Sequence, residues 1–149
     1  LALVDGHLAP LSGAIEAPIG RDPRQRKRMA VVGEGKEART LYRVIRYLGD
    51  YTLVEVTLET GRTHQIRVHL SAIGHPVVGD PVYGLRRSRK EKRSLDRKTL
   101  ALVKALPGQA LHAHSLRFRH PISGQELSFS VPPPPALVRL LAHLGRRVL

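Results

Sequence analysis

The sequence contains no cysteine, which excludes disulfide bonds and thiolate metal sites and fits a protein of the reducing cytoplasm. Tryptophan is also absent, and only six residues are aromatic, so a base-stacking platform of the kind several RNA-binding modules use is poorly supported. No apolar run approaches the roughly 20 residues that cross a bilayer, and no signal-peptide pattern is present. We therefore expect a cytoplasmic protein without a membrane partner.

Acidic residues are scarce beside basic ones, and the formal net charge is +13 over 149 residues. A charge this large favours a polyanionic partner, because cations displace the counterions of phosphates, although a generic solubility surface is the alternative. Thirteen of the cations lie in two runs, Arg21–Arg28 and Arg86–Lys98. Their concentration predicts phosphate contacts, most directly by Arg24, Arg26, Lys27 and Arg28 of the first run.

Alternating apolar and polar residues predict an antiparallel hairpin over residues 39–59, with Gly49 and Asp50 as its turn. A second hairpin is predicted from residues 110–119 and 125–131. Shorter extended pieces are expected at residues 1–4, 14–19 and 29–32, and helices at about 91–105 and 136–145. These elements predict one mixed α+β domain over residues 1–149, with a mainly antiparallel sheet and flanking helices.

A further helix should follow the first hairpin. Thr63 is suited to cap its start, Ile66, His69, Leu70 and Ile73 have the spacing of one helix face, and Gly74 can close it in a left-handed conformation.

The start of this helix carries the residues best suited to chemistry. Free N–H groups and the helix dipole favour an anion there, Arg62 flanks the end, and Arg67 lies one turn in. A capped helix with a solvated arginine explains the pattern equally well. His64 and His69 are five residues apart, which places them on different faces, so no metal site is predicted.

Two longer segments, residues 61–70 and 74–84, resemble the C-terminal signature of RluA-type RNA pseudouridine synthases. Shorter pieces match this family in the same order, at residues 18–21, 29–31, 36–40, 42–44, 109–113 and 120–124. The resemblance extends to about Pro135 and implies a partial pseudouridine synthase fold.

This resemblance implies an isomerase that needs no cofactor. Such enzymes turn a uridine out of the RNA, break its glycosidic bond, rotate the uracil and rejoin it through carbon, with an aspartate acting at the sugar. Arg67 matches the family arginine that pairs with this aspartate and keeps it ionised. Arg62, Thr63, His64 and Gln65 are carried over as substrate-binding or RNA-binding candidates.

The family's catalytic aspartate lies in a His-Arg-Leu-Asp segment that the 149 residues do not contain. Asp80 matches a loop that is structural in the family, and the four tyrosines are expected to pack in the sheet and loops. Since the sequence begins at Leu1, within an expected strand, we interpret it as a fragment without turnover of its own. Its expected partners are RNA, most often large-subunit ribosomal RNA in this family, and the missing N-terminal half. We otherwise expect a monomer.

A non-catalytic basic RNA-binding module is the alternative. The retained Arg67 favours the enzyme interpretation, because a binding module has no use for an arginine that serves an absent carboxylate.

Overall fold

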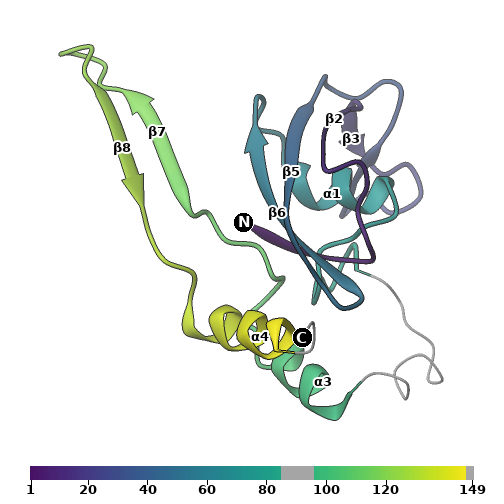
Figure 1. Ribbon diagram of the computed structural model, residues 1–149. Helices are drawn as coiled ribbons and strands as arrows, with labels where there is room; N and C mark the ends of the chain where they lie inside the picture. The colour runs from purple at the N-terminus through teal and green to yellow at the C-terminus, as the bar shows by residue number, and fades with distance from the viewer. Residues whose placement is uncertain (85–95, 147–149) are drawn as a thin grey trace.

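The computed structural model describes residues 1–84 and 96–146. Its centre is a four-stranded antiparallel sheet in the order β1-β6-β5-β2, formed by Ala2–Asp5, Tyr51–Leu58, Arg39–Leu48 and Ser12–Glu16. All four β1 residues are buried, and Leu3, Val4 and Val54 have no exposed surface. The helix α1 lies beside this sheet (Figure 1). The predicted α+β class is confirmed.

The hairpin predicted over residues 39–59 is present as β5 and β6, and Gly49 has the positive φ of 62° that its tight turn requires. The strict alternation fails at one point, where the register shifts between Val44 and Arg46. This irregularity leaves Ile45 44% exposed.

Helix α1, Gln65–Ala72, follows the hairpin, and Gly74 closes it with φ 86° as predicted. The predicted Thr63 cap is wrong. His64 occupies the N-cap position in the left-handed conformation, and no side chain caps the helix. The buried face also differs, since Ile73 is 39% exposed and the buried positions are Gln65, Val68, His69 and Leu70.

Beside α1, the short strands β3 (Ile19–Arg21) and β4 (Met29–Val31) form a two-stranded sheet. The first basic run connects them. Residues 75–84, without strand or helix, form the structured loop expected from their prolines and glycines, and Val77 and Val78 are buried within it.

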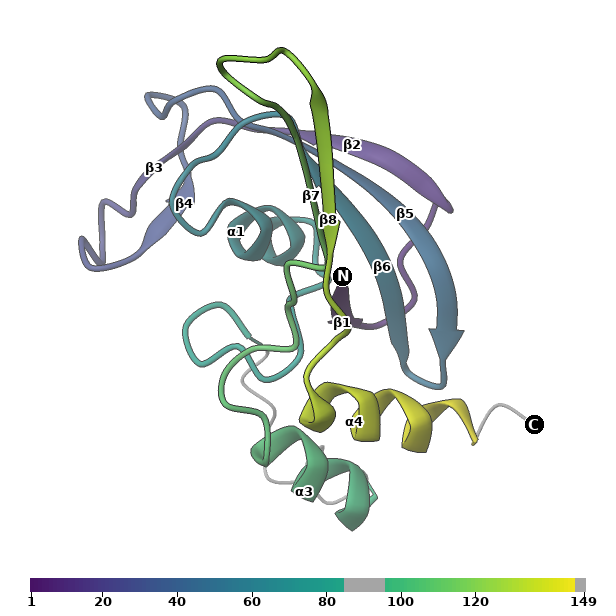
Figure 2. The same ribbon diagram turned by 90° about the vertical axis from the view of Figure 1, so that its left-hand side faces the viewer.

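The C-terminal part contains helices α3 (Arg97–Lys104) and α4 (Pro135–Gly145), which pack against each other at one end of the molecule (Figure 2). Asp96 caps α3, accepting hydrogen bonds from the backbone N–H groups of Lys98 and Thr99. Residues 91–95 of the predicted helix lie outside the described residues. The predicted helix at 136–145 is confirmed.

In the sequence between α3 and α4, β7 (Ser115–Arg119) and β8 (Glu126–Ser130) form a hairpin that projects from the rest of the molecule (Figure 1). We call this hairpin the arm. The predicted first strand began too early, at residue 110. Residues 110–112 instead bond to β1 and its neighbour, with the N–H of Leu3 donating to Ala110 and that of His112 to Leu1. Within the described residues, no helix is long and apolar enough to cross a membrane.

Candidate functional site

Arg67 forms a two-point ion pair with Asp80. Its Nε donates to Oδ2 at 2.7 Å and its Nη2 to Oδ1 at 2.9 Å. The Asp80 side chain has no exposed surface, and that of Arg67 is 11% exposed. The pair therefore lies at the edge of the interior, with only a small part of the Arg67 side chain exposed.

The loop after α1 holds the Asp80 carboxylate in place. Oδ1 also accepts from the backbone N–H groups of Val82 at 2.9 Å and Tyr83 at 3.0 Å. Burial acts to raise the pKa of Asp80, but the hydrogen bonds from Arg67, Tyr83 and Val82 together lower it below its ordinary value. The carboxylate is therefore ionised and fully occupied by its neighbours, which agrees with the structural role expected for this loop.

A glycine makes the tight return of this loop possible. A Cβ on Gly84 would lie 2.2 Å from the carbonyl oxygen of Asp80, closer than atoms can approach without a backbone shift. The Gly84 N–H instead donates to that oxygen at 3.1 Å.

Tyr83 connects the ion pair to the surrounding elements. Its hydroxyl accepts from the backbone N–H of Met29 at 2.9 Å and is hydrogen-bonded to Nδ1 of His64 at 3.0 Å. The guanidinium carbons of Arg67 and Arg28 lie 4.9 and 5.2 Å from its ring centroid. Tyr83 thus ties the start of β4 to the start of α1 and stacks against two cations. From the sequence, Tyr83 was expected only to pack in a loop. Its position three residues after Asp80 is the sequence feature that could have placed it at the site.

His64 is exposed at the start of α1. Desolvation, followed by the positive charge of Arg67, lowers its pKa below the ordinary value. The ring is therefore neutral near pH 7, when it can still hydrogen-bond but adds no cation to the site.

Gln65, predicted as an RNA contact, is 2% exposed. Its Oε1 accepts from the Thr60 hydroxyl and the Arg62 N–H, while its Nε2 donates to the Arg39 carbonyl and the Thr40 hydroxyl. All hydrogen-bonding positions of the amide are used within the protein. Gln65 therefore fixes the turn between β6 and α1 and, in this structure, presents no free polar group to a ligand.

The other candidates near α1 are placed differently. Arg62 and Thr63 are both exposed, and Arg62 Nε donates to the Glu37 carbonyl at 2.9 Å. His69 is completely buried, with Nδ1 bonded to Thr40 and Nε2 to the Ala17 carbonyl. His69 is thus a core residue, and no cluster of metal-ligating side chains occurs in the parts of the chain that are described.

The first basic run forms a short loop organised by Asp22. Its Oδ1 accepts from the backbone N–H groups of Arg24 and Gln25, and its other oxygen pairs with Arg28 Nε at 3.1 Å. The Arg24 N–H bond is the main cause that lowers the pKa of Asp22. Arg21 is exposed at the end of β3, and Arg24, Arg26 and Lys27 are exposed in the loop that follows, so the run presents four cations, while Arg28 is half-buried against Tyr83.

Most of the second basic run, residues 86–95, lies outside the described residues. Its last two cations, Arg97 and Lys98, are exposed in the first turn of α3. Figures 1 and 2 place α3 at the opposite end of the molecule from the loop between β3 and β4.

Comparison with known proteins gives consistent matches. The model of the RNA pseudouridylate synthase family matches residues 1–72. An RNA pseudouridine synthase of Chloroflexus aurantiacus is 51% identical over 98% of this chain and 42% of its own length. The ribosomal large subunit pseudouridine synthase D of Nitrosomonas europaea is 52% identical over 95% of this chain and 39% of its own length. The chain thus spans about two fifths of the length of these relatives.

Solved structures agree with these matches. Human RNA pseudouridylate synthase domain containing 1 superposes with a TM-score of 0.70 at 32% identity, over 91% of this chain and 55% of that one.

Proposed function

Because the chain belongs to the RluA-type RNA pseudouridine synthase family, we propose that it forms the C-terminal portion of a catalytic domain that isomerises uridine to pseudouridine in RNA. In this proposal residues 1–149 supply the arginine side of the active site and part of the RNA-binding surface. The catalytic aspartate belongs to a part of the protein that these residues do not contain.

The ion pair of Arg67 is the observation that carries this proposal. Asp80 uses Nε and Nη2, and the structure gives Nη1 no hydrogen-bond partner within the described residues. A guanidinium with a free edge can donate to a second carboxylate and hold it ionised, since a nearby positive charge lowers a carboxyl pKa. Ionisation is what an aspartate needs in order to attack the sugar or remove a proton from it.

Asp80 itself does not serve as that aspartate in the proposal. Its two oxygens already accept from Arg67, Val82 and Tyr83, and its side chain has no exposed surface. Without a second carboxylate, residues 1–149 are proposed to have no turnover of their own.

RNA is the proposed substrate, and large-subunit ribosomal RNA is the proposed class because the Nitrosomonas europaea relative is a large-subunit synthase by name. The exposed cations of the loop between β3 and β4 support phosphate contacts near the site, since Arg28 of this loop and Arg67 flank the same Tyr83 ring. Arg62, Thr63 and His64 are exposed beside them and are proposed to contact the nucleotide that leaves the stack.

An isomerisation assay tests the proposal. A protein that contains these residues and the aspartate segment should convert uridine to pseudouridine in ribosomal RNA, as detected by chromatography of the digested nucleosides. Residues 1–149 alone should bind the RNA without converting it. If the longer protein binds RNA but forms no pseudouridine in any RNA offered, the alternative of a non-catalytic basic RNA-binding module replaces the proposal.

A further inference from the structure

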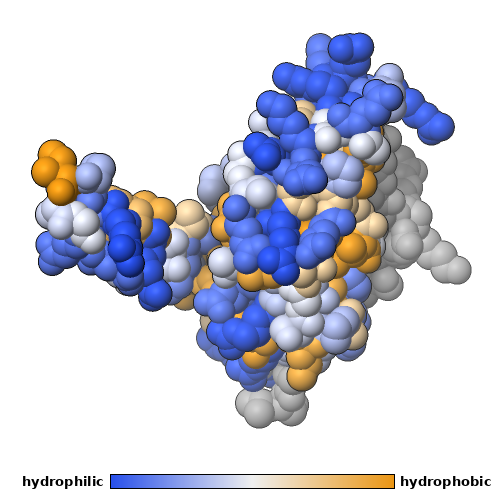
Figure 3. Space-filling view, turned by 90° about the horizontal axis from the view of Figure 1, so that it is seen from above, coloured by the Kyte–Doolittle hydropathy of each residue, from blue (hydrophilic) through white to orange (hydrophobic). Residues whose placement is uncertain are grey.

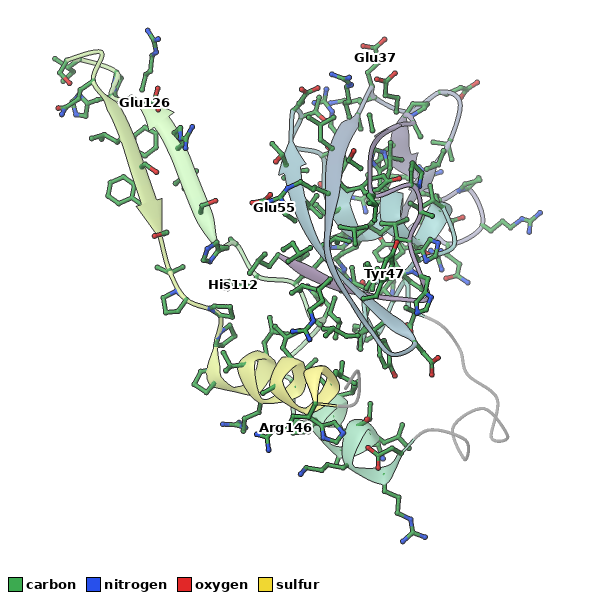
Figure 4. All side chains as sticks on the ribbon, in the orientation of Figure 1. Glu37, Tyr47, Glu55, His112, Glu126 and Arg146 are labelled. Atoms are coloured by element: carbon green, nitrogen blue, oxygen red, sulfur yellow. The ribbon has the colours of Figure 1, made fainter. Side chains whose placement is uncertain are left out.

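Among the described residues, His64 is the only one besides glycines with a positive φ, and its φ of 57° and ψ of 21° turn the chain just before α1. It lies near the end of the central sheet where β5 begins, because Arg62, two residues earlier, donates to the Glu37 carbonyl. Figure 4 labels Glu37 at this end. Seen from above, hydrophilic side chains cover much of it (Figure 3). An uncommon backbone conformation at an exposed, polar position makes His64 a candidate for a functional role.

The hydroxyl of Tyr83 holds the His64 ring through a hydrogen bond whose direction is set by a third group. The backbone N–H of Met29 can only donate, so Oη of Tyr83 is the acceptor in their 2.9 Å hydrogen bond. The same Oη lies 3.0 Å from Nδ1 of His64. Tyr83 is 5% exposed, and its hydroxyl has no third hydrogen-bond partner in the part of the chain that the structure describes. The hydroxyl hydrogen is therefore directed at Nδ1.

This direction determines which ring nitrogen of His64 carries a hydrogen. If Nδ1 carried one, two donors would face each other, and the buried hydroxyl hydrogen would lose its acceptor. Nδ1 is therefore the unprotonated nitrogen, and the hydrogen of the neutral ring lies on Nε2. A doubly protonated ring conflicts with the same hydrogen bond. This agrees with the pKa of His64, which desolvation and then the charge of Arg67 hold below its ordinary value.

The orientation of the His64 ring is held as well. The ring packs edge-on against Tyr83, with the ring planes 72° apart and the centroids 5.6 Å apart. His64 is exposed, and its Nε2 has no hydrogen-bond partner among the residues that are described. The guanidinium carbon of Arg67 lies 4.9 Å from the centroid of the same Tyr83 ring. His64 therefore presents one uncharged N–H donor near the exposed edge of the arginine site.

We propose that Tyr83 is a positioning residue that keeps His64 in this tautomer, and that the Nε2–H of His64 donates to the 4-carbonyl oxygen of a uracil in bound RNA. Cytosine carries an amino group at this position, so the same geometry would place a donor against a donor. A site built to hydrogen-bond one group rejects an analogue that lacks it, and the contact therefore selects uracil. This inference rests on the proposed RNA substrate and does not require turnover.

An uncharged donor suits a base carbonyl better than a phosphate. Phosphate contacts draw their strength from charge, and exposed cations are available in Arg62 and in the first basic run. A neutral imidazole adds no charge. Its fixed polarity, as a donor and not an acceptor, is what distinguishes a carbonyl from an amino group. Bases that leave the stack are recognised in this way, through hydrogen bonds to their Watson–Crick edges.

Nitrogen NMR of a longer protein that also contains the aspartate segment tests the role of Tyr83. With isotope-labelled histidine, the signals of the two ring nitrogens show which one carries a hydrogen, and His64→Gln identifies the signals of residue 64. In the neutral ring Nε2 should be protonated and Nδ1 unprotonated. Tyr83→Phe keeps the aromatic ring and removes the hydroxyl, so it should leave His64 as a mixture of both tautomers. A hydrogen on Nδ1 in the native protein, or an unchanged tautomer in Tyr83→Phe, would overturn the proposal.

Two RNA probes of equal length, oligouridylate and oligocytidylate, test the base contact, because they carry the same phosphates and riboses. The longer protein should bind oligouridylate about fivefold more tightly, the factor that one neutral hydrogen bond supplies. His64→Ala should bring the two dissociation constants together by weakening the oligouridylate complex. His7→Ala is the matched control and should leave the ratio unchanged. His7 is also exposed, but it packs against Tyr47, which lies away from Glu37 toward the other end of the hairpin (Figure 4).

The outcomes separate this inference from the proposed function. Equal weakening of both complexes by His64→Ala would assign His64 to a phosphate or ribose and overturn the base contact. Equal affinity of the native protein for the two probes would overturn it too, even if the protein converts uridine. A protein with the expected tautomer and preference that forms no pseudouridine would support the contact and contradict the proposed isomerisation alone.

Discussion

Arg67 and Asp80 are joined by two parallel hydrogen bonds, although they lie on different elements, one in helix α1 and the other in the loop that follows it. The carboxylate is completely covered and the guanidinium nearly so. This geometry fixes the plane of the guanidinium before any substrate or second carboxylate arrives, and such preorganisation is what an electrostatic role in catalysis requires.

The first prediction concerns the stability of this pair. Asp80→Asn should lower the free energy of unfolding by about 3 kcal/mol or more, because it leaves a mostly buried guanidinium without its counter-ion. Urea denaturation measures the loss. Glu55→Gln, which breaks the exposed pair with Arg43, is the control and should cost less than about 1 kcal/mol. Equal losses would show that Arg67 and Asp80 contribute no more than a surface pair.

The second prediction follows from the lowered pKa of Asp80. A carboxyl whose pKa is lower in the folded protein than in the unfolded one contributes stability above the unfolded pKa of about 4 and loses it as the pH falls through the folded value. Between about pH 5 and pH 2, the native chain should therefore lose more stability than Asp80→Asn does. Parallel curves of unfolding free energy against pH would contradict this assignment.

The third prediction concerns the tight loop behind the pair. Gly84→Ala should destabilise the protein by about 1–3 kcal/mol, because the new methyl group collides with the Asp80 carbonyl and forces the backbone to move. Gly33→Ala is the matched control, since nothing lies within 4 Å of its added Cβ. Thermal unfolding of both variants distinguishes a steric effect at residue 84 from a general cost of replacing glycine.

The fourth prediction separates RNA binding from the arginine site. Replacing Arg24, Arg26 and Lys27 together by glutamine should weaken RNA binding. It should also reduce the slope of log K against log salt by about 0.7 for each phosphate of single-stranded RNA that the variant no longer neutralises. Replacing the exposed Arg43, Arg46 and Arg139 removes the same charge elsewhere. If this control variant loses as much affinity and slope, the loop between β3 and β4 has no specific role.

Local patterns predicted the parts of the fold that depend on local rules. Alternation located the hairpin over residues 39–59, and Gly49 and Gly74 occupy the positive-φ positions that a tight turn and a helix end require. The predicted Thr63 cap failed because Gln65 organises this turn through bonds to Thr60, Arg62 and the start of β5. Such bonds depend on where the strand ends in space, and a capping rule applied to neighbouring residues does not include them.

The sequence predicted only the part of the site that a local motif contains. The motif located Arg67, and the resemblance supplied its expected role. Its pairing with Asp80 depends on a loop that returns over thirteen residues, and the contact of Tyr83 with Met29 joins residues 54 positions apart. No periodicity encodes contacts of this kind. The exposure of the arm could not be predicted either. Alternating apolar residues predict a strand, but they do not indicate whether another element packs against its apolar face.

The proposed role of Arg67 in turnover can be measured in a longer protein that also contains the aspartate segment. Initial rates of pseudouridine formation and RNA affinity should be measured for Arg67→Ala and Arg67→Lys, with circular dichroism to confirm that each variant is folded. We predict that Arg67→Ala lowers the rate at least a hundredfold while the RNA dissociation constant changes less than threefold, and that lysine restores part of the rate. Equal losses of rate and affinity in folded Arg67→Ala would show that Arg67 is an RNA contact and has no separate role in turnover.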